Sequence, residues 1–444
     1  MNDTERRPRP RPSGPIRHGR QHTSSPVAAV VKWLAVAAAV ALVSVGAVTA
    51  YAVTSVAQQF SANAVDISNG EDAPAPPPLL GAFEGGFNML IIGTDNDPNQ
   101  GEDFGERDAT LNDVNILLHV SADHSNAVVV SFPRDLVMAH PECTDPATGE
   151  VFDAMSAQPL NDAFARGGLA CVATTITDLT GVPIQYAAAT SFNGVIEMTN
   201  AVGGVPVCLV EPIVDTDSGL DLPAGTSTIE GQMALSFLRN RHGVGDGSDL
   251  ARIASQQQYL ASLIRTMKSS NTLTDVTKLY GLAQAASQNI LPSQSLASVD
   301  AMVSLALTLK DIDLSKIVFA QYPVGSSSDY PGKVVPLQST ADELFAKVLN
   351  DEPFTLGADS TGTGSTIVED PANPTAEAPV EEAPVEEAPV EPADPGAEAP
   401  VDPEAPVDPS TEVPTTEVPT APEVIEGVKG QTADQQTCAN PFSG

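Results

Sequence analysis

Residues 88–93 (NMLIIG) form a continuous apolar run that Thr94 and Asp95 end. A short apolar run that stops at polar residues predicts a buried β-strand. Residues 114–120 and 127–132 have the same character and predict two more buried strands. These three strands predict the centre of a sheet, from which the rest of the fold can be worked out.

Helical and strand patterns alternate along the chain after these strands. The predicted helices are residues 170–179, 193–201, 230–241, 249–268, 295–309 and 340–349, and the further strands are 186–192, 205–210 and 317–321. Such alternation indicates an α/β fold of about 270 residues with one core. We therefore predict a three-layer α-β-α sandwich with a central mixed sheet at residues 87–356.

The N-terminal part has a basic head and then an apolar segment. Residues 1–32 carry seven Lys and Arg against two acids, and residues 33–53 (WLAVAAAVALVSVGAVTAYAV) carry no charge. An uncharged segment of this length can cross a hydrocarbon core of about 30 Å. We predict a single-pass transmembrane helix with a cytoplasmic head and an extracellular domain, and a cleaved signal peptide is the alternative. Residues 54–86 are predicted to be a linker.

The C-terminal part is strongly acidic. Residues 357–444 hold nineteen acidic residues against Lys429, and Ala-Pro-Val recurs five times. Chains rich in Pro and acid bury too little apolar surface to offset their entropy. We predict a disordered acidic tail, either a spacer through a cell wall or a solvated end without a specific partner.

The charge balance excludes one class of partner. The chain has 21 Lys and Arg against 57 Asp and Glu, a net charge of −36. Nucleic-acid binding needs clustered cations on the phosphates, so we predict no nucleic-acid partner.

Four cysteines lie in the part that is predicted to be external. They are Cys143, Cys171, Cys208 and Cys438. An even number in an oxidising compartment predicts one or two disulfides, and we favour Cys143 with Cys171. Free buried thiols remain the alternative.

The arginines of the predicted domain are few and clustered. Arg239, Arg241 and Arg252 lie within fourteen residues, separated by a Gly-rich loop. Gln256 lies one helical turn after Arg252, on the same face. Guanidinium groups bind phosphate through paired hydrogen bonds, so this segment predicts a phosphate or pyrophosphate site. Surface ion pairs with the many acids are the alternative.

Polar residues also follow the predicted central strands. Asp95 follows the first strand, Asp113 begins the second, and Arg134 and Asp135 follow the third. Because carboxylates at neighbouring strand ends converge on one edge of a sheet, Asp95 and Asp113 predict a Mg²⁺ site.

Calcium is a competing interpretation for the loop after Asp95. Four residues match EF-hand positions, namely Asp95, Asp97, Asn99 and Glu106. Gln100 stands where Gly is expected, and the loop follows a strand instead of a helix, so calcium is disfavoured. Together with the arginines, the carboxylates favour phosphoryl transfer.

These motifs resemble the LytR-CpsA-Psr family, in its actinobacterial form, over about residues 87–325. The matching segments are NMLIIGTD (88–95), Asn112-Asp113, SFPRD (131–135), LNDAFARGG (160–168), AVGGVPV (201–207) and the segment 238–258 with RNRHGVGDGSDLARIASQQQ. The resemblance implies a membrane-anchored phosphotransferase that moves a glycopolymer from an undecaprenyl pyrophosphate carrier to peptidoglycan.

The resemblance also implies roles for residues. Asp95 and Asp113 would bind Mg²⁺, and Asp135 would orient the pyrophosphate. The residues that would grip the pyrophosphate are Arg134, Arg239, Arg241, Arg252 and Gln256. The catalytic residues would be Arg134, Asp135, Arg239 and Arg241. An apolar groove would take the prenyl chain.

Two positions depart from the family pattern. Leu111 and Ser255 stand where members often carry Arg, and Arg107 is a candidate to replace the first. The same arginines leave a second interpretation open, a non-enzymatic envelope sensor or scaffold that binds a lipid pyrophosphate. Pyrophosphate hydrolysis is a third.

Overall fold

The structure is a computed structural model that describes part of the chain. The described residues are 27, 30–37, 40, 44, 60–68, 82–96, 109–146, 148–270, 272–368 and 422–443. The chain divides into two compact units, residues 1–55 and residues 56–444. Most of the predicted head and transmembrane segment lies outside the described residues. Among the residues that are described, no helix combines the length and apolar character that a membrane span requires.

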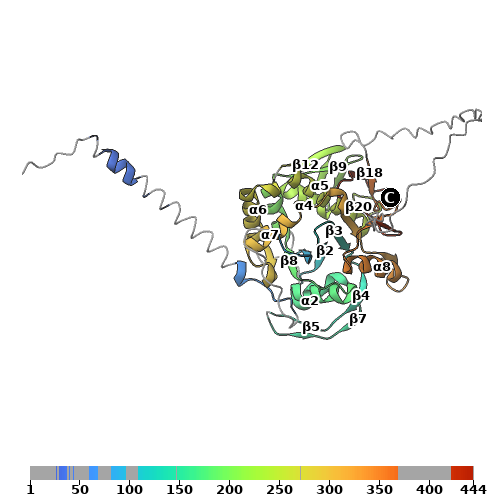
Figure 1. The fold of residues 1–444 in the computed structure, drawn as a ribbon. Coiled ribbons are helices and arrows are strands. Elements are labelled where there is room, and N and C mark those ends of the chain that lie inside the picture. Colours follow the sequence, from blue (N-terminus) through green and yellow to red (C-terminus); the bar gives the residue numbers. More distant parts are fainter. Residues whose placement is uncertain are drawn as a thin grey trace, which may run out of the picture. The chain divides into compact units, whose positions relative to one another are not determined.

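A seven-stranded sheet forms the centre of the second unit (Figure 1). Its order is β13 (Ile290–Pro292), β8 (Tyr186–Thr190), β1 (Phe87–Thr94), β2 (Asn112–Val120), β3 (Ala127–Phe132), β14 (Ile317–Gln321) and β20 (Gly430–Thr432). The pairs β1 with β8 and β3 with β14 are parallel, and the other neighbours are antiparallel. The predicted mixed α/β fold with a central mixed sheet is confirmed.

Helices lie on both faces of this sheet (Figure 1). They are α2 (Ala163–Thr180) and α8 (Gln338–Leu349) on one face, and α5 (Asp249–Ser269) and α7 (Val299–Thr308) on the other. The alternation of side chains along β1 explains both layers, because successive residues of a strand point to opposite faces. Leu90 and Ile92 pack with α2, whereas Met89 and Ile91 pack on the opposite face.

A smaller sheet lies beyond α5. Its order is β12 (Gly225–Ile229), β9 (Val205–Leu209), β21 (Thr437–Ala439) and β18 (Ser365–Ile367). It shares a core with α4 (Gly231–Arg239) and with α5, in which Val207, Phe237 and Tyr259 are buried. Helix α5 therefore packs between two sheets, which explains why nearly all of its first half is buried.

The remaining elements complete the unit. The helices are α3 (Phe192–Val202) and α6 (Val276–Asn289), with the 3-10 turns η1 (Leu160–Asp162), η2 (Thr272–Thr274), η3 (Gln294–Leu296) and η4 (Leu314–Lys316). The strands are β4 (Val137–His140), β5 (Cys143–Thr144), β6 (Val151–Phe152), β7 (Met155–Pro159), β10 (Ile213–Asp215), β11 (Leu220–Leu222), β15 (Val324–Ser326), β16 (Val334–Pro336), β17 (Phe354–Leu356) and β19 (Glu423–Ile425).

The sequence pattern located most, though not all, of the long helices. Helix α5 and strand β14 have nearly the predicted bounds, whereas α6 was not predicted. Helix α2 begins at Ala163, before the predicted residue 170, and it is kinked at Gly167 and Gly168. Gly168 has φ 62° and ψ −150°, a conformation that residues with a side chain rarely adopt.

The prediction of a disordered tail from residue 357 is wrong at both of its ends. Residues 357–368 and 422–443 carry strands of the domain, and Cys438 is bonded to Cys208. These residues are folded because they supply what the tail composition lacks, such as the buried side chains of Ile425, Val428 and Cys438. Residues 369–421 lie outside the described part.

The predicted linker also contains residues that pack on the domain. Val65 exchanges backbone hydrogen bonds with Pro292 and Gln294, both of 2.9 Å. The side chain of Phe60 is buried, and Phe83 packs edge-on against Phe87. The domain therefore includes residues 60–68 and 82–86, which the sequence pattern assigned to the linker.

Candidate functional site

An apolar cavity of about 540 Å³ lies between the central sheet and the helices of one face. Its walls come from β1 and β2 on one side and from α3, α4, α5 and α6 on the other. The apolar lining residues are Ile91, Val114, Ile116, Phe192, Val195, Met198, Ala201, Val202, Leu235, Leu238, Tyr259, Leu260, Leu263, Met267, Leu282 and Ala286. Charged residues join this lining at the end of β2 and β3, where Asp113, Arg134, Arg239, Arg241 and Arg252 lie.

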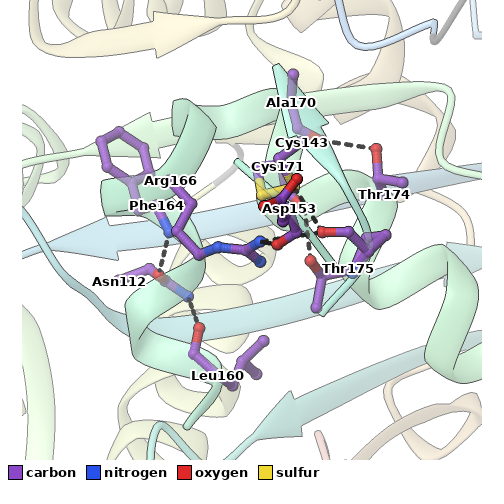
Figure 2. Close-up of a disulfide and its surroundings, with 11 residues drawn as sticks. Asn112, Cys143, Asp153, Leu160, Phe164, Arg166, Ala170, Cys171, Thr174 and Thr175 are labelled. Carbon is purple, nitrogen blue, oxygen red and sulfur yellow. Dashed lines mark hydrogen bonds between the residues drawn. A yellow bond between two sulfur atoms is a disulfide. The ribbon is translucent and has the colours of Figure 1, made fainter. Parts of the chain in front are cut away.

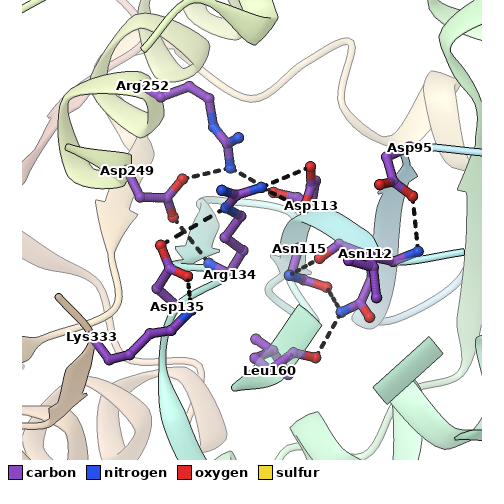
Figure 3. Close-up of polar contacts among 11 residues, drawn as sticks. Asp95, Asn112, Asp113, Asn115, Arg134, Asp135, Leu160, Asp249, Arg252 and Lys333 are labelled. Atoms are coloured by element: carbon purple, nitrogen blue, oxygen red, sulfur yellow. Dashed lines mark hydrogen bonds and ion pairs between the residues drawn. The ribbon is translucent and has the colours of Figure 1, made fainter. Parts of the chain in front are cut away.

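Arg134 lies just after β3, and three neighbouring carboxylates surround it. Pro133 follows the strand, and the backbone N–H of Arg134 donates to Asp249 at 3.0 Å. The Arg134 Nη1 donates to both carboxylate oxygens of Asp113, at 2.9 and 3.0 Å (Figure 3). Burial opposes the charge, but Asp113, Asp249 and Asp135 together raise the pKa of Arg134. The guanidinium is therefore a permanent cation.

Arg252 is placed by the first turn of α5. Ser248 caps this helix, accepting a hydrogen bond from the N–H of Ala251. The Arg252 Nη2 lies 2.5 Å from Asp249 and donates to the backbone oxygen of Asp113 at 2.7 Å. Asp249 thus joins Arg252 to the backbone of Arg134, so that the helix start and the end of β3 have fixed relative positions.

Arg239 and Arg241 lie at the end of α4. The guanidinium of Arg239 stacks over the ring of Phe192, 4.4 Å from its centroid. The Nε of Arg241, like those of Arg134 and Arg252, is buried and has no hydrogen-bond partner among the described residues. Burial, and then the charges of Arg134 and Arg252, lower the pKa of Arg241. An anion bound between these three cations would relieve their repulsion and would accept the unpaired N–H.

Gln256 lines the same cavity and also forms a hydrogen bond between two helices. Its Nε2 donates to the backbone oxygen of Leu238 at 3.0 Å, so it ties α5 to the end of α4. Gln256 therefore contacts the end of α4, whereas Arg252, one turn earlier, bonds to Asp249 and to the backbone of Asp113.

Of the two predicted metal carboxylates, Asp95 follows β1 and Asp113 lies in β2, and they bond to different partners, Asp95 to the N–H of Leu111 and Asp113 to Arg134 (Figure 3). The register shifts between Gly93 and Thr94, and Asp113 is the extra residue of the resulting bulge. Asp95 is buried, and its Oδ1 accepts the N–H of Leu111 at 2.9 Å. No cluster of three or more His, Cys, Asp or Glu that could hold a metal occurs among the described residues. Two carboxylates nevertheless suit Mg²⁺, which commonly takes one or two from the protein and completes its shell with water and phosphate.

The segment 160–168 forms hydrogen bonds with the first residues of β2. Asn112 donates to Asn115 and to the backbone oxygen of Leu160, at 2.7 and 3.1 Å, and accepts the N–H of Phe164 at 2.9 Å. Arg166 points away from the cavity, toward the disulfide of Cys143 with Cys171 (Figure 2). It donates to the backbone oxygens of Pro141 and Asp153. This motif therefore fixes the position of Asp113 and does not itself line the cavity.

The structure brings together the predicted site residues of the described chain and adds two more. Six of them line the cavity, namely Asp113, Arg134, Arg239, Arg241, Arg252 and Gln256. Asp135 is not part of the lining but lies against Arg134, whereas Asp95 is outside the lining and hydrogen-bonds with Leu111. The two additional residues are Asp249, which pairs with Arg252, and Lys333, which pairs with Asp135. Lys333 carries no sequence signal, because it lies in a hairpin outside the recognised motifs. Arg107 and the EF-hand positions 97, 99 and 106 lie outside the described residues.

The predicted disulfide of Cys143 with Cys171 is present, and a second disulfide joins Cys208 to Cys438. Two bonds agree with the expected one or two disulfides, but the pairing of the second was not assigned, since 230 residues separate its cysteines in the sequence.

Fold and site together define a class: an α/β protein with an apolar cavity that ends in arginines and carboxylates, suited to an amphiphile with a phosphate head. The chain belongs to the LytR_cpsA_psr family, whose model matches residues 47–347.

Several characterised proteins are similar to this chain. The cell wall biosynthesis protein LcpA of Corynebacterium glutamicum is 30% identical over 292 residues, 60% of this chain and 55% of LcpA. The polyisoprenyl-teichoic acid–peptidoglycan teichoic acid transferase TagT of Bacillus subtilis is 24% identical over 304 residues, 66% of this chain and 88% of TagT. The match thus spans only about half the length of LcpA.

A solved structure is also similar. The LytR-Csp2A-Psr enzyme from Actinomyces oris aligns with 64% of this chain and 94% of its own, at 20% identity and a TM-score of 0.47.

Proposed function

We propose that this protein transfers a glycopolymer from a polyprenyl pyrophosphate carrier, with undecaprenyl as the prenyl group, to peptidoglycan. Membership of the family supports the proposal, as does similarity to TagT, whose name describes transfer from a polyisoprenyl-linked teichoic acid to peptidoglycan. The observation that carries it is the cavity itself, in which an apolar lining ends at four arginines and one carboxylate.

The two ends of the cavity suit the two ends of such a donor. An apolar chain gains about 25 cal/mol for each Å² that it buries, which favours the prenyl group in the apolar part. The pyrophosphate would lie between Arg134, Arg241 and Arg252, where the unpaired N–H of Arg241 would gain an acceptor. In this proposal the phosphates lie at the charged end of the cavity and the lipid lies along its apolar part.

The same arrangement supports phosphoryl transfer. An acceptor hydroxyl of peptidoglycan forms a bond to the phosphorus next to the polymer and loses its proton to solvent or to the leaving group, the bridging P–O bond breaks, and prenyl phosphate leaves. Negative charge grows on the bridging oxygen, which leaves with the prenyl phosphate, during this step. Arginines already fixed by Asp113 and Asp249 can stabilise this charge without reorganising.

Mg²⁺ is part of the proposal. Asp95 and Asp113 would hold it, and the bound ion would neutralise part of the pyrophosphate charge. Arg134 already binds Asp113, so this carboxylate links the proposed metal position to the arginines. We also propose that residues 33–53 anchor the protein in the cell membrane with the domain outside, which brings the cavity close to its lipid donor.

Substitution of Arg239 tests the proposed function in cells. Arg239→Ala removes a cation from the cavity lining while α4 keeps its buried residues, so the protein should fold and polymer should no longer be attached to the wall. The measurement is the phosphate or glycan content of the purified wall. Lys310→Ala, which changes an exposed lysine after α7, is the control. Normal wall polymer with Arg239→Ala as the sole copy would overturn the proposal.

A second candidate is a non-enzymatic sensor or scaffold that binds a lipid pyrophosphate. It is favoured by the two positions that depart from the family pattern. Leu111 supplies only a backbone N–H to Asp95, and Ser255 is buried within α5, where its hydroxyl donates to the oxygen of Ala251. Tight binding of a prenyl pyrophosphate with no transferred product and no released prenyl phosphate would favour this candidate.

A further inference from the structure

Asp135 lies between two cations that come from different parts of the chain (Figure 3). Its Oδ1 forms an ion pair with the Nζ of Lys333. Its Oδ2 lies 3.8 Å from the Nε of Arg134, which is within ion-pair range and too long for a hydrogen bond. The carboxylate is thus held by Lys333 and only approached by Arg134.

The position of Lys333 is fixed by the backbone around it. The N–H of Val334 donates to the oxygen of Asp135 at 3.2 Å, and Val334 forms a parallel bridge with Leu136. The N–H of Lys333 donates to the oxygen of Tyr330 at 3.0 Å, which closes the turn before β16. Lys333 and Asp135 are therefore adjacent because an isolated bridge joins the residues that follow them, Val334 and Leu136, although 198 residues separate the pair in the sequence.

As a consequence, only some N–H groups of the Arg134 side chain have hydrogen-bond partners. Its Nη1 binds Asp113 through two hydrogen bonds, whereas its Nε is buried and has no hydrogen-bond partner among the described residues. A carboxylate that was free to move by about 1 Å would pair with this Nε, because bidentate pairs of Arg with a carboxylate are strong.

We propose that Lys333 is a positioning residue, which holds Asp135 away from Arg134 and so keeps the Arg134 guanidinium able to bind a phosphate group. This inference rests on the proposed function, because it assigns to Arg134 a pyrophosphate ligand. Neither the recognised motifs nor the apolar cavity include Lys333.

Loss of Lys333 has a specific consequence for the donor. Asp135 loses its partner and closes on Arg134, which then carries two bound carboxylates, Asp113 and Asp135. A guanidinium neutralised twice attracts pyrophosphate less, so the affinity for the donor falls. Removing the charge of Asp135 as well reverses this loss, because no carboxylate is left to close on Arg134.

The test is a double-mutant cycle on the full-length chain, with farnesyl pyrophosphate as the probe and titration calorimetry as the measurement. The variants are Lys333→Met, Lys333→Arg, Asp135→Asn and the double variant Lys333→Met with Asp135→Asn. Lys347→Met is the matched control, since Lys347 pairs with Glu352 and Glu423 away from the cavity. Melting temperatures show whether each variant folds, and Lys333→Gln replaces Lys333→Met if the latter does not.

We expect Lys333→Met to weaken binding about tenfold, the size of one charge-assisted interaction. Lys333→Arg and Lys347→Met should stay within about twofold of the wild type. The double variant should bind as tightly as Asp135→Asn alone. The inference is overturned if Lys333→Met binds like the wild type, or if the double variant stays as weak as Lys333→Met, which would mean direct contact of Lys333 with the ligand. A wild type that binds no probe would overturn the proposed function as well.

Discussion

At the residue scale, Arg241 is the cation that the fold stabilises least. Its Nε has no hydrogen-bond partner among the described residues, and Arg134 and Arg252 repel it. A buried, unpaired donor beside like charges lowers stability, so its presence indicates a ligand. The other arginines of the site have protein partners that would hold them even without a ligand.

Arg241→Met should therefore separate stability from binding. The free energy of unfolding should stay the same or rise by about 1 kcal/mol, because the buried N–H and two repulsions disappear. Affinity for a prenyl pyrophosphate should fall roughly 10- to 100-fold, the value of a hydrogen bond to a charged group. Chemical denaturation and calorimetry measure the two quantities.

Arg265→Met is the matched control for that experiment. Arg265 lies on α5, and its Nη1 donates to the backbone oxygens of Ala433 and Gln435, at 2.6 and 3.0 Å. Its loss should lower the free energy of unfolding by about 1–3 kcal/mol and leave binding unchanged. Unchanged affinity in Arg241→Met together with weaker binding in Arg265→Met would contradict the assignment of Arg241 to the ligand.

His140 predicts a loss of stability at mild acid pH. Burial and the neighbouring charge of Arg166 lower its pKa from 6.5 to about 4. The unfolded chain therefore takes up a proton before the folded chain does, and the free energy of unfolding falls as the pH drops from about 6.5 toward 4. We expect His140→Phe to reduce this fall by roughly 2 kcal/mol, after solvent screening is allowed for.

Denaturation at pH 7 and at pH 4.5 measures the effect for both proteins. His119 is a second buried histidine with a lowered pKa, mainly through burial, so only the difference between wild type and variant reports on His140. An equal pH dependence of the two proteins would show that His140 does not contribute.

At the element scale, helix α2 is joined to the β4–β7 region by the disulfide of Cys143 with Cys171 (Figure 2). The bond closes a loop of 28 residues and lies away from the cavity lining. A loop of this length corresponds to about 3–4 kcal/mol of stabilisation through the entropy of the unfolded chain. The bond is thus expected to support the fold without acting on the ligand.

The double variant Cys143→Ala with Cys171→Ala should therefore unfold more readily while its folded form binds normally. The melting temperature should fall clearly, and affinity for a prenyl pyrophosphate at low temperature should match the wild type. A large loss of affinity in a protein that is still folded would instead connect α2 to the cavity.

The elements differ in how far the sequence predicted them. Strands β1, β3 and β14 were predictable because they are apolar runs between polar residues. Helix α6 was not, because its polar residues and central Gly281 give a weak apolar pattern. The arginines of the site followed from their rarity in an acidic chain, whereas Lys333 and Asp135 meet beside an isolated bridge between Val334 and Leu136, which leaves no local pattern.

At the scale of the whole molecule, the C-terminal residues hold the loop between the site arginines. The N–H of Gly245 donates to Asn440 at 3.1 Å, and the N–H groups of Phe442 and Ser443 donate to Gly243 and Gly245 at 3.0 Å. The composition of residues 357–444 concealed this role, because the acidic repeats dominate the average. The contact depends on a pairing over some 200 residues, which only the folded chain reveals.

Deleting residues 440–444 tests this contact and spares the disulfide of Cys208 with Cys438. The loop of residues 243–247 should loosen, so that Arg241 and Arg252 keep their chemistry and lose their fixed spacing. We expect a fall in melting temperature of a few degrees and roughly tenfold weaker binding of a prenyl pyrophosphate. Unchanged affinity would mean that the loop holds its shape without these residues.

The central claim, transfer of a polymer from a prenyl pyrophosphate to peptidoglycan, is tested most directly by counting products. Purified full-length protein is incubated with Mg²⁺, a prenyl-pyrophosphate-linked polymer and peptidoglycan, and both prenyl phosphate and wall-bound polymer are quantified. We expect equal amounts of the two products, with the polymer joined to the wall by a phosphodiester. Arg239→Ala should give neither product. Prenyl phosphate without wall-bound polymer would indicate hydrolysis, and tight binding without any product would contradict the claim.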